Sequence, residues 1–164
     1  MAKMKMYGAE EYALKLSKLA ANSKEVAEKA IQEAAGIVTD QVRANIQALP
    51  AVKEIENIKA YKEGGKSHLS IRQKEGLLKS LGITPVAMDN GFYNAKIGFD
   101  GYNNIRTKKY PKGQPNQLIA RVGESGSTYM DKTPFMRKAL TATRGKAMQR
   151  MQEIIDDEFK KLMK

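Results

Sequence analysis

An alanine-rich run of apolar residues at four-residue steps constrains the fold more than any other feature of this sequence. The run consists of Val26, Ala30, Ala34, Val38, Val42 and Ile46. Steps of this size keep side chains on one face of an α-helix, because a turn holds 3.6 residues. Asn22 or Ser23 can cap the helix at its start, and Pro50 closes it. We therefore predict a long N-terminal helix whose small side chains let another element approach closely.

Apolar spacing predicts four further helical segments. The first covers residues 9–20, with Tyr12, Leu16 and Leu19 as its stripe, and is separated from the long helix at Asn22 and Ser23. The second is weak and covers residues 51–61, and the third covers residues 70–81 and ends at Gly82 in left-handed geometry. The last runs from Pro134, with Thr133 as its N-cap, to about residue 163. Its predicted apolar stripe comprises Met136, Leu140, Ala147, Met151, Ile155, Phe159 and Leu162.

Strands are predicted between the third and the last helix. Asp89, Asn90 and Gly91 form a hairpin signal, because Asn-Gly tolerates the positive φ of a tight turn. The following residues Tyr93, Ala95, Ile97 and Phe99 alternate onto one face, and Pro85 indicates an edge or bulged strand before the turn. Residues 118–122, LIARV, also alternate and predict a further strand that ends in the turn GESGS.

These elements predict an α+β fold, in which long N-terminal and C-terminal helices pack on a small antiparallel sheet of about three to four strands. The 164 residues suit one domain that covers the whole chain. The segments at about 63–70 and 100–116 are rich in Gly, Asn or Pro, and we expect them to be flexible in the isolated protein.

Composition excludes several classes of site. The chain has no cysteine, so it holds neither disulfides nor thiolate-bound metals. It contains no apolar run of about 18 residues, and no apolar segment follows the basic N-terminal residues, which predicts a soluble chain that is not exported. The formal net charge of +11 favours polyanionic partners such as nucleic acid or an acidic protein surface.

Residues suited to catalysis are few, and we expect no enzyme activity, cofactor or metal. His68, the single histidine, has no evident Ser or Asp partner and is predicted to be a solvated loop residue. Four acids lie near predicted turns and could gather around magnesium in a nuclease: Asp89, Asp100, Glu124 and Asp131. This carboxylate nuclease is the most distant alternative. The segment GESGS lacks the Lys-Ser/Thr ending of a phosphate-binding loop.

Two basic clusters are candidate contacts for DNA or for an acidic partner. Arg106, Lys108, Lys109 and Lys112 surround Tyr110 on a predicted loop. A second run has no acid within it and contains Lys132, Arg137, Lys138, Arg144, Lys146 and Arg150, but it forms no single helical stripe. Such clusters can bind DNA without reading its sequence, because they neutralise phosphates. The methionines around the last helix fit either a core or an adaptable subunit interface.

The order of motifs resembles a known viral family. An AAGIVTDQVRANIQALP segment is followed by KEGLLKSLGI, then by strands, ARVGESGS and TPFMRKAL. From about residue 30 onward this is similar to the neck or tail-completion proteins of long-tailed bacteriophages, minor tail components that prophages often encode. The matching positions are Glu124, Gly126, Pro134, Phe135, Ala139 and Leu140. Ser125 stands where the family has an aromatic residue, Ser127 where it has Thr, and Glu75-Gly76 where it has Thr-Gly.

The resemblance implies a virion structural protein of the head–tail junction or of tail completion, made in the bacterial cytoplasm. It implies assembly with other tail or neck proteins as a homo-oligomer, and it carries no catalytic residues, so the motif residues are expected to be structural. A sequence-independent DNA-binding protein that uses the basic loop and helix is the alternative.

Overall fold

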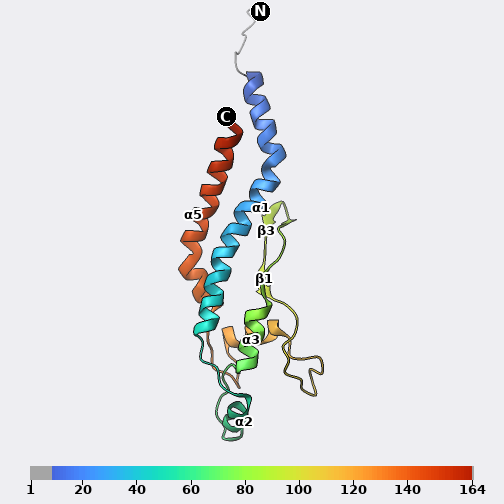
Figure 1. Ribbon diagram of the computed structural model, residues 1–164, viewed down its shortest axis with the longest axis vertical. Helices are drawn as coiled ribbons and strands as arrows, with labels where there is room; N and C mark the ends of the chain where they lie inside the picture. Colours follow the sequence, from blue (N-terminus) through green and yellow to red (C-terminus); the bar gives the residue numbers. More distant parts are fainter. Residues whose placement is uncertain (1–8, 164) are drawn as a thin grey trace, which may run out of the picture.

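The computed structural model describes residues 9–163, apart from the side chains at positions 9–13, 15, 16, 19, 162 and 163. Two long helices, α1 (Ala9–Ala48) and α5 (Met136–Met163), lie side by side with their chains running in opposite directions (Figure 1). The hairpin strands lie against α1, on the side away from α5, and the short helices gather at one end of the pair (Figure 1). The molecule is therefore elongated, and it has the predicted α+β composition.

The long N-terminal helix is confirmed, and it is longer than predicted. Ala30, Ala34, Val42 and Ile46 are buried on one face of α1, as the four-residue steps require. The predicted break at Asn22 and Ser23 is wrong, because α1 runs through it without interruption.

The hydroxyl of Ser23 is accommodated within the helix. It donates to the backbone carbonyl of Ala20 (2.8 Å) instead of capping a new helix. The helical location of Tyr12, Leu16 and Leu19 is confirmed, whereas the packing predicted for these side chains lies outside the described part of the structure.

Two short helices follow α1. Helix α2 (Glu54–Lys62) has no buried residue, and α3 (Ile71–Ser80) begins with a capping box in which Ser70 and Gln73 exchange hydrogen bonds. The prediction that Gly82 ends α3 in left-handed geometry is wrong. Leu81 is extended at the helix end, and Gly82 continues into a strand.

Four short strands form two antiparallel pairs. Strand β1 (Leu81–Ile83) pairs with β4 (Ile97–Phe99), with Leu81 opposite Phe99. Strand β2 (Ala87–Asp89) pairs with β3 (Phe92–Asn94) across the predicted turn. Asn90 and Gly91 take φ values of 51° and 81°, as a tight two-residue hairpin demands.

The strand predicted at residues 118–122 is wrong, because this segment lies within helix α4 (Asn116–Ser125). Its buried residues are Asn116, Ile119, Ala120 and Gly123, and their spacing matches one face of a helix. The turn after it is in place, since Gly126 follows α4 with φ 75°. Helix α5 starts two residues later than predicted, and the Thr133 hydroxyl donates to the carbonyl of Gly123 (3.2 Å) instead of capping α5.

The core lies where the C-terminal half of α1 meets α3, α4, β1 and the start of α5. Its fully buried large side chains are Phe135, Ile46, Leu77 and Val42. The apolar stripe predicted for the last helix holds in part: Ala147 is buried and Met136 packs against the core, whereas Leu140 and Phe159 are exposed. The face of α5 that packs on α1 carries Ala147 together with three residues that the stripe did not include: Ala139, Thr143 and Ile154.

Candidate functional surfaces

Glu124 fixes the joint between α4 and α5. Its carboxylate accepts the backbone N–H groups of Phe135 (2.8 Å), Met136 (2.9 Å) and Arg137 (3.0 Å). The first N–H groups of a helix have no partner within the helix, and a negative charge is favourable there. Gly126 is needed at the turn between the two helices, because a side chain at its positive φ would press on Lys132. Glu124 and Gly126 therefore orient α5.

Loss of this cap is expected to be measurable. E124A should lower the free energy of unfolding by about 2 kcal/mol, because the start of α5 loses a charged acceptor. E124Q should fall between E124A and the wild type, since the amide keeps one oxygen. Urea denaturation measures the difference. E75A removes an exposed carboxylate from α3 and should change stability by less than about 0.5 kcal/mol; equal stability of E124A and E75A would contradict the capping role.

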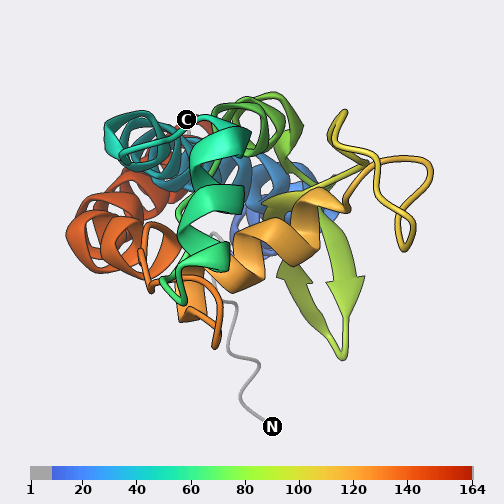
Figure 2. The same ribbon diagram turned by 90° about the horizontal axis from the view of Figure 1, so that it is seen from below.

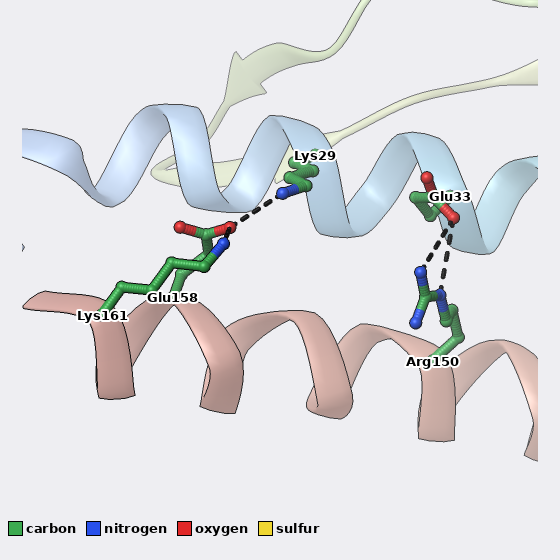
Figure 3. Close-up of polar contacts among 5 residues, drawn as sticks. All are labelled: Lys29, Glu33, Arg150, Glu158 and Lys161. Carbon is green, nitrogen blue, oxygen red and sulfur yellow. Dashed lines mark hydrogen bonds and ion pairs between the residues drawn. The ribbon is translucent and has the colours of Figure 1, made fainter.

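Two polar clusters join α1 and α5 in the part of the helix pair that lies away from the core (Figure 3). Lys29 donates to Glu158 (2.8 Å), and Lys161 donates to the same carboxylate oxygen (2.9 Å). One turn further along α1, Arg150 of α5 lies 3.5 Å from Glu33. All these groups keep contact with water, so each pair adds little to stability. The clusters fix which faces of the two helices meet.

In the cluster of Lys29, Glu158 and Lys161, the contacts favour the charged forms of Lys29 and Glu158. The hydrogen bond to Glu158 raises the pKa of Lys29, and the hydrogen bonds from Lys29 and Lys161 lower the pKa of Glu158. A lowered carboxyl pKa stabilises the fold above the usual carboxyl range, and this contribution is lost as the pH falls through the lowered value. A raised lysine pKa has the opposite sign, so its contribution is lost as the pH rises through the raised value.

The predicted basic loop projects from the body of the molecule (Figure 2). Arg106, Lys108, Lys109 and Lys112 are all exposed, and the Lys109 ammonium lies 5.5 Å from the centre of the Tyr110 ring. Within residues 9–163 none of the four forms an ion pair. The loop is anchored at its base, where Asn103 and Gln114 exchange backbone and side-chain hydrogen bonds. The structure therefore presents four cations together on one side of the molecule.

The second basic run is divided by the structure. Arg150 pairs with Glu33 and Glu153, so it belongs to the contact between α1 and α5. Arg137, Lys138, Arg144 and Lys146 are exposed and form no ion pair in the described part of the chain. These four residues lie in the first half of α5.

Three of the four acids considered for magnesium have separate tasks. Glu124 caps α5, Asp131 pairs with Lys66 (3.0 Å), and Asp100 accepts the N–H of Gly101 (2.6 Å). The fourth, Asp89, is exposed at the end of β2. Between residues 9 and 163 no group of three or more acids or histidines is arranged to hold a metal ion. His68 is exposed, as predicted. Its backbone N–H donates to the side-chain oxygen of Asn57, and its backbone carbonyl accepts a hydrogen bond from the Asn57 side-chain amide.

Apolar side chains are exposed at places that the sequence did not single out. On α2, Ile55, Ile58 and Tyr61 face solvent, and the Tyr61 ring contacts that of Tyr129 (centroids 5.8 Å apart). The hairpin exposes Met88 and Phe92. Helix α2 lies at one end of the molecule and the hairpin lies beside α1 (Figures 1 and 2). The weak apolar spacing of residues 51–61 predicted a helix there, but it did not predict that the apolar side chains of this helix are exposed to solvent.

A cleft of about 430 Å³ lies between α3 and the base of the loop. Charged side chains of both signs line it, among them Arg72, Glu75, Lys79 and Asp100. Gly76 is required at its wall, because a Cβ there would lie 2.8 Å from the Asn116 side-chain oxygen. The mixed charges favour no single class of ligand.

None of the helices between residues 9 and 163 combines the length and apolar character needed to cross a bilayer. Comparison with protein-family models, with curated proteins and with solved structures finds no match to this chain.

Proposed function

We propose that this protein is a structural component of a long-tailed bacteriophage, at the head–tail junction or in tail completion, and that it acts through protein–protein contacts in the virion. Its neighbours in this proposal are other tail or neck proteins and further copies of itself. The observation that carries the proposal is the exposure of large apolar side chains at three separate places, on α2, on the hairpin and on α5. Exposed apolar groups that gather in patches are typical of surfaces that partners cover.

The resemblance of the sequence motifs supports the same function. Glu124, Gly126, Pro134 and Phe135 belong to the joint that sets the direction of α5. A structural role in a helix joint accounts for these motif residues without any catalytic role. The segment before Glu124 departs from the family pattern, since it is helical where the family has a strand.

Deletion of the gene from a phage or prophage that carries it tests the proposal. Electron microscopy of the lysate should show heads without tails, or heads and tails that fail to join, and complementation should restore infectious particles. Normal infectious particles from the deletion strain would disprove the proposal.

The alternative function is sequence-independent DNA binding through the basic loop. The exposure of Arg106, Lys108, Lys109 and Lys112 on a projecting loop favours it. The same cations would also suit an acidic face of a neighbouring protein. DNA that passes through a head–tail junction makes the two functions compatible.

Salt dependence separates these two uses of the loop. If the loop binds DNA, the triple variant K108A/K109A/K112A should weaken binding to duplexes of unrelated sequence equally. It should also reduce the slope of log K against log salt by about 0.9 for each phosphate that the variant no longer neutralises. Fluorescence anisotropy at several salt concentrations measures the slope. K59A/K62A on α2 is the matched control, and absence of binding at low salt would remove this alternative.

A further inference from the structure

Helix α5 carries a second apolar face beside the one that packs on α1. Its members are Leu140, Met148, Met151, Ile155 and Phe159, and here they are named the outer stripe. At about 100° per residue they fall within about 100° of one another, and the centre of the stripe is rotated by about 110° from that of the buried face. Leu140, Met148 and Phe159 are 55%, 59% and 43% exposed, and Met151 and Ile155 are half-buried.

The outer stripe is accessible to a partner. Helix α5 forms one side of the molecule, and α1 lies between it and the hairpin (Figure 1). The stripe extends over about 28 Å of helix, from Leu140 to Phe159, at 1.5 Å per residue. Such a length is suited to a second helix that lies along α5.

The spacing within the stripe is symmetric. Together with Arg144, which lies on the same side of α5, its members occupy positions 140, 144, 148, 151, 155 and 159 at steps of four, four, three, four and four, so the series is the same in both directions. When two copies of α5 lie antiparallel, Leu140 faces Phe159 of the other copy and Met148 faces Met151. Such a contact is closed by a two-fold axis, which is the commonest symmetry of protein dimers.

Charge along α5 favours the same arrangement. Residues 137–150 contain five basic residues and no acid, whereas residues 153–158 contain four acids and no basic residue. In the antiparallel register Arg144 and Lys146 of one copy lie opposite positions 155 and 153, in the acidic segment of the other copy, whereas Lys138 lies opposite Lys161. Parallel copies would place each of the two charged segments against itself, so that like charges meet along both. Arg144, which interrupts the stripe, then lies beside Ile155 and Asp156 of the other copy.

We propose that the occupant of the outer stripe is a second copy of this chain, bound through an antiparallel α5–α5 contact with a two-fold axis between Met148 and Met151. The bulky side chains that α1 leaves uncovered become the core of this interface; Arg144 lies among them, and Lys138 and Asp156 lie at the edge. The proposal concerns the isolated protein and does not rest on a role in the virion.

Mass measurement of the full-length protein is the first test. Sedimentation equilibrium over a range of concentrations should show a monomer–dimer equilibrium, and M148E should weaken dimerisation at least 100-fold because two carboxylates would be buried at the two-fold axis. I58E changes an equally exposed residue on α2 and should leave the equilibrium unchanged. A wild-type chain that stays monomeric, or an M148E variant that dimerises normally, would overturn the proposal.

Cross-linking tests the direction of the helices. The chain lacks native cysteine, so L140C and F159C can each be labelled at one position. With a short bis-maleimide, neither variant alone should give cross-linked dimers, because identical positions lie roughly 28 Å apart along antiparallel helices. A mixture of the two variants should cross-link. Self-linking of L140C would indicate parallel helices and, like failure of the mixture to cross-link, would refute the antiparallel contact.

Discussion

F135A should lower the free energy of unfolding by about 3–5 kcal/mol, the largest effect expected from a single side-chain truncation in this protein. Phe135 is 1% exposed and packs edge-on against Phe99, with ring centroids 5.9 Å apart. It belongs to the core cluster in which α1, α3, α4, β1 and the start of α5 meet. Removal of the ring leaves a cavity among elements that also pack on one another, so the core cannot close around it.

The backbone of Phe135 explains why this cavity cannot be relieved by a shift of the chain. Its N–H group donates to Glu124, and its carbonyl accepts a hydrogen bond from the Asn45 side chain of α1 (2.9 Å). A movement of residue 135 would break one of these bonds. Urea denaturation followed by circular dichroism measures the decrease in stability.

Two variants serve as controls for F135A. F92A removes the same ring from the hairpin, where the residue is 75% exposed, and should change stability by less than about 0.5 kcal/mol. F135L keeps most of the apolar volume and should cost less than about 1.5 kcal/mol. If F135A and F92A were equally stable, Phe135 would not belong to the core.

Sequence patterns correctly predicted the elements whose conformation is determined by residues close together in the sequence. The four-residue steps of Ala30, Ala34, Val42 and Ile46 placed the buried face of α1, because a helix that packs on a single side needs nothing else to determine it. Asn90 and Gly91 placed the hairpin for a similar reason, since their positive φ values are a property of the two residues. The long C-terminal helix was predicted from its apolar periodicity and from Pro134, which lies two residues before its first residue.

Tertiary contacts decided the elements that the patterns predicted wrongly. Five alternating residues at 118–122 suit a strand as well as a helix. In the fold the buried positions are Asn116, Ile119, Ala120 and Gly123, which share one face only in a helix. On α5, the predicted apolar stripe is rotated from the buried face, although Ala147 belongs to both. Ala139, Thr143 and Ala147 pack on the alanine face of α1, because small side chains on both helices let the axes approach closely.

The candidate surfaces were predicted unevenly for the same reason. The four cations of the basic loop are close in sequence, so their proximity needed no fold. Glu124 was predicted to be structural, but its role as the cap of α5 depends on N–H groups 11 to 13 residues away. Ile55 and Ile58 are exposed because no other element within residues 9–163 packs over that face of α2, and the arrangement of the elements is a property of the whole fold.

The base of the basic loop depends on a single glycine. Gly113 is buried with φ 112°, a conformation that side chains rarely adopt, and a Cβ there would overlap the carbonyl oxygen of Asn103. The backbone around it is held by hydrogen bonds from the Asn103 N–H to the Gln114 carbonyl (2.9 Å) and from the Gln114 N–H to the Asn103 side chain (3.1 Å). Because the overlapping atom belongs to the backbone, no side-chain rotation can relieve it.

G113A should therefore open the base of the loop and lower the free energy of unfolding by about 3 kcal/mol or more, the sum of backbone strain and overpacking. Hydrogen exchange should locate the damage, with faster exchange at the N–H groups of Asn103 and Gln114 and unchanged exchange in the middle of α1. G101A is the matched control: Gly101 also has a positive φ of 63°, but open space surrounds its Cβ position, so about 1 kcal/mol is expected from strain alone. Protection of Asn103 that is the same in G113A as in the wild type would show that the loop base tolerates a side chain, and that the backbone contact between Asn103 and Gly113 does not hold the loop in place.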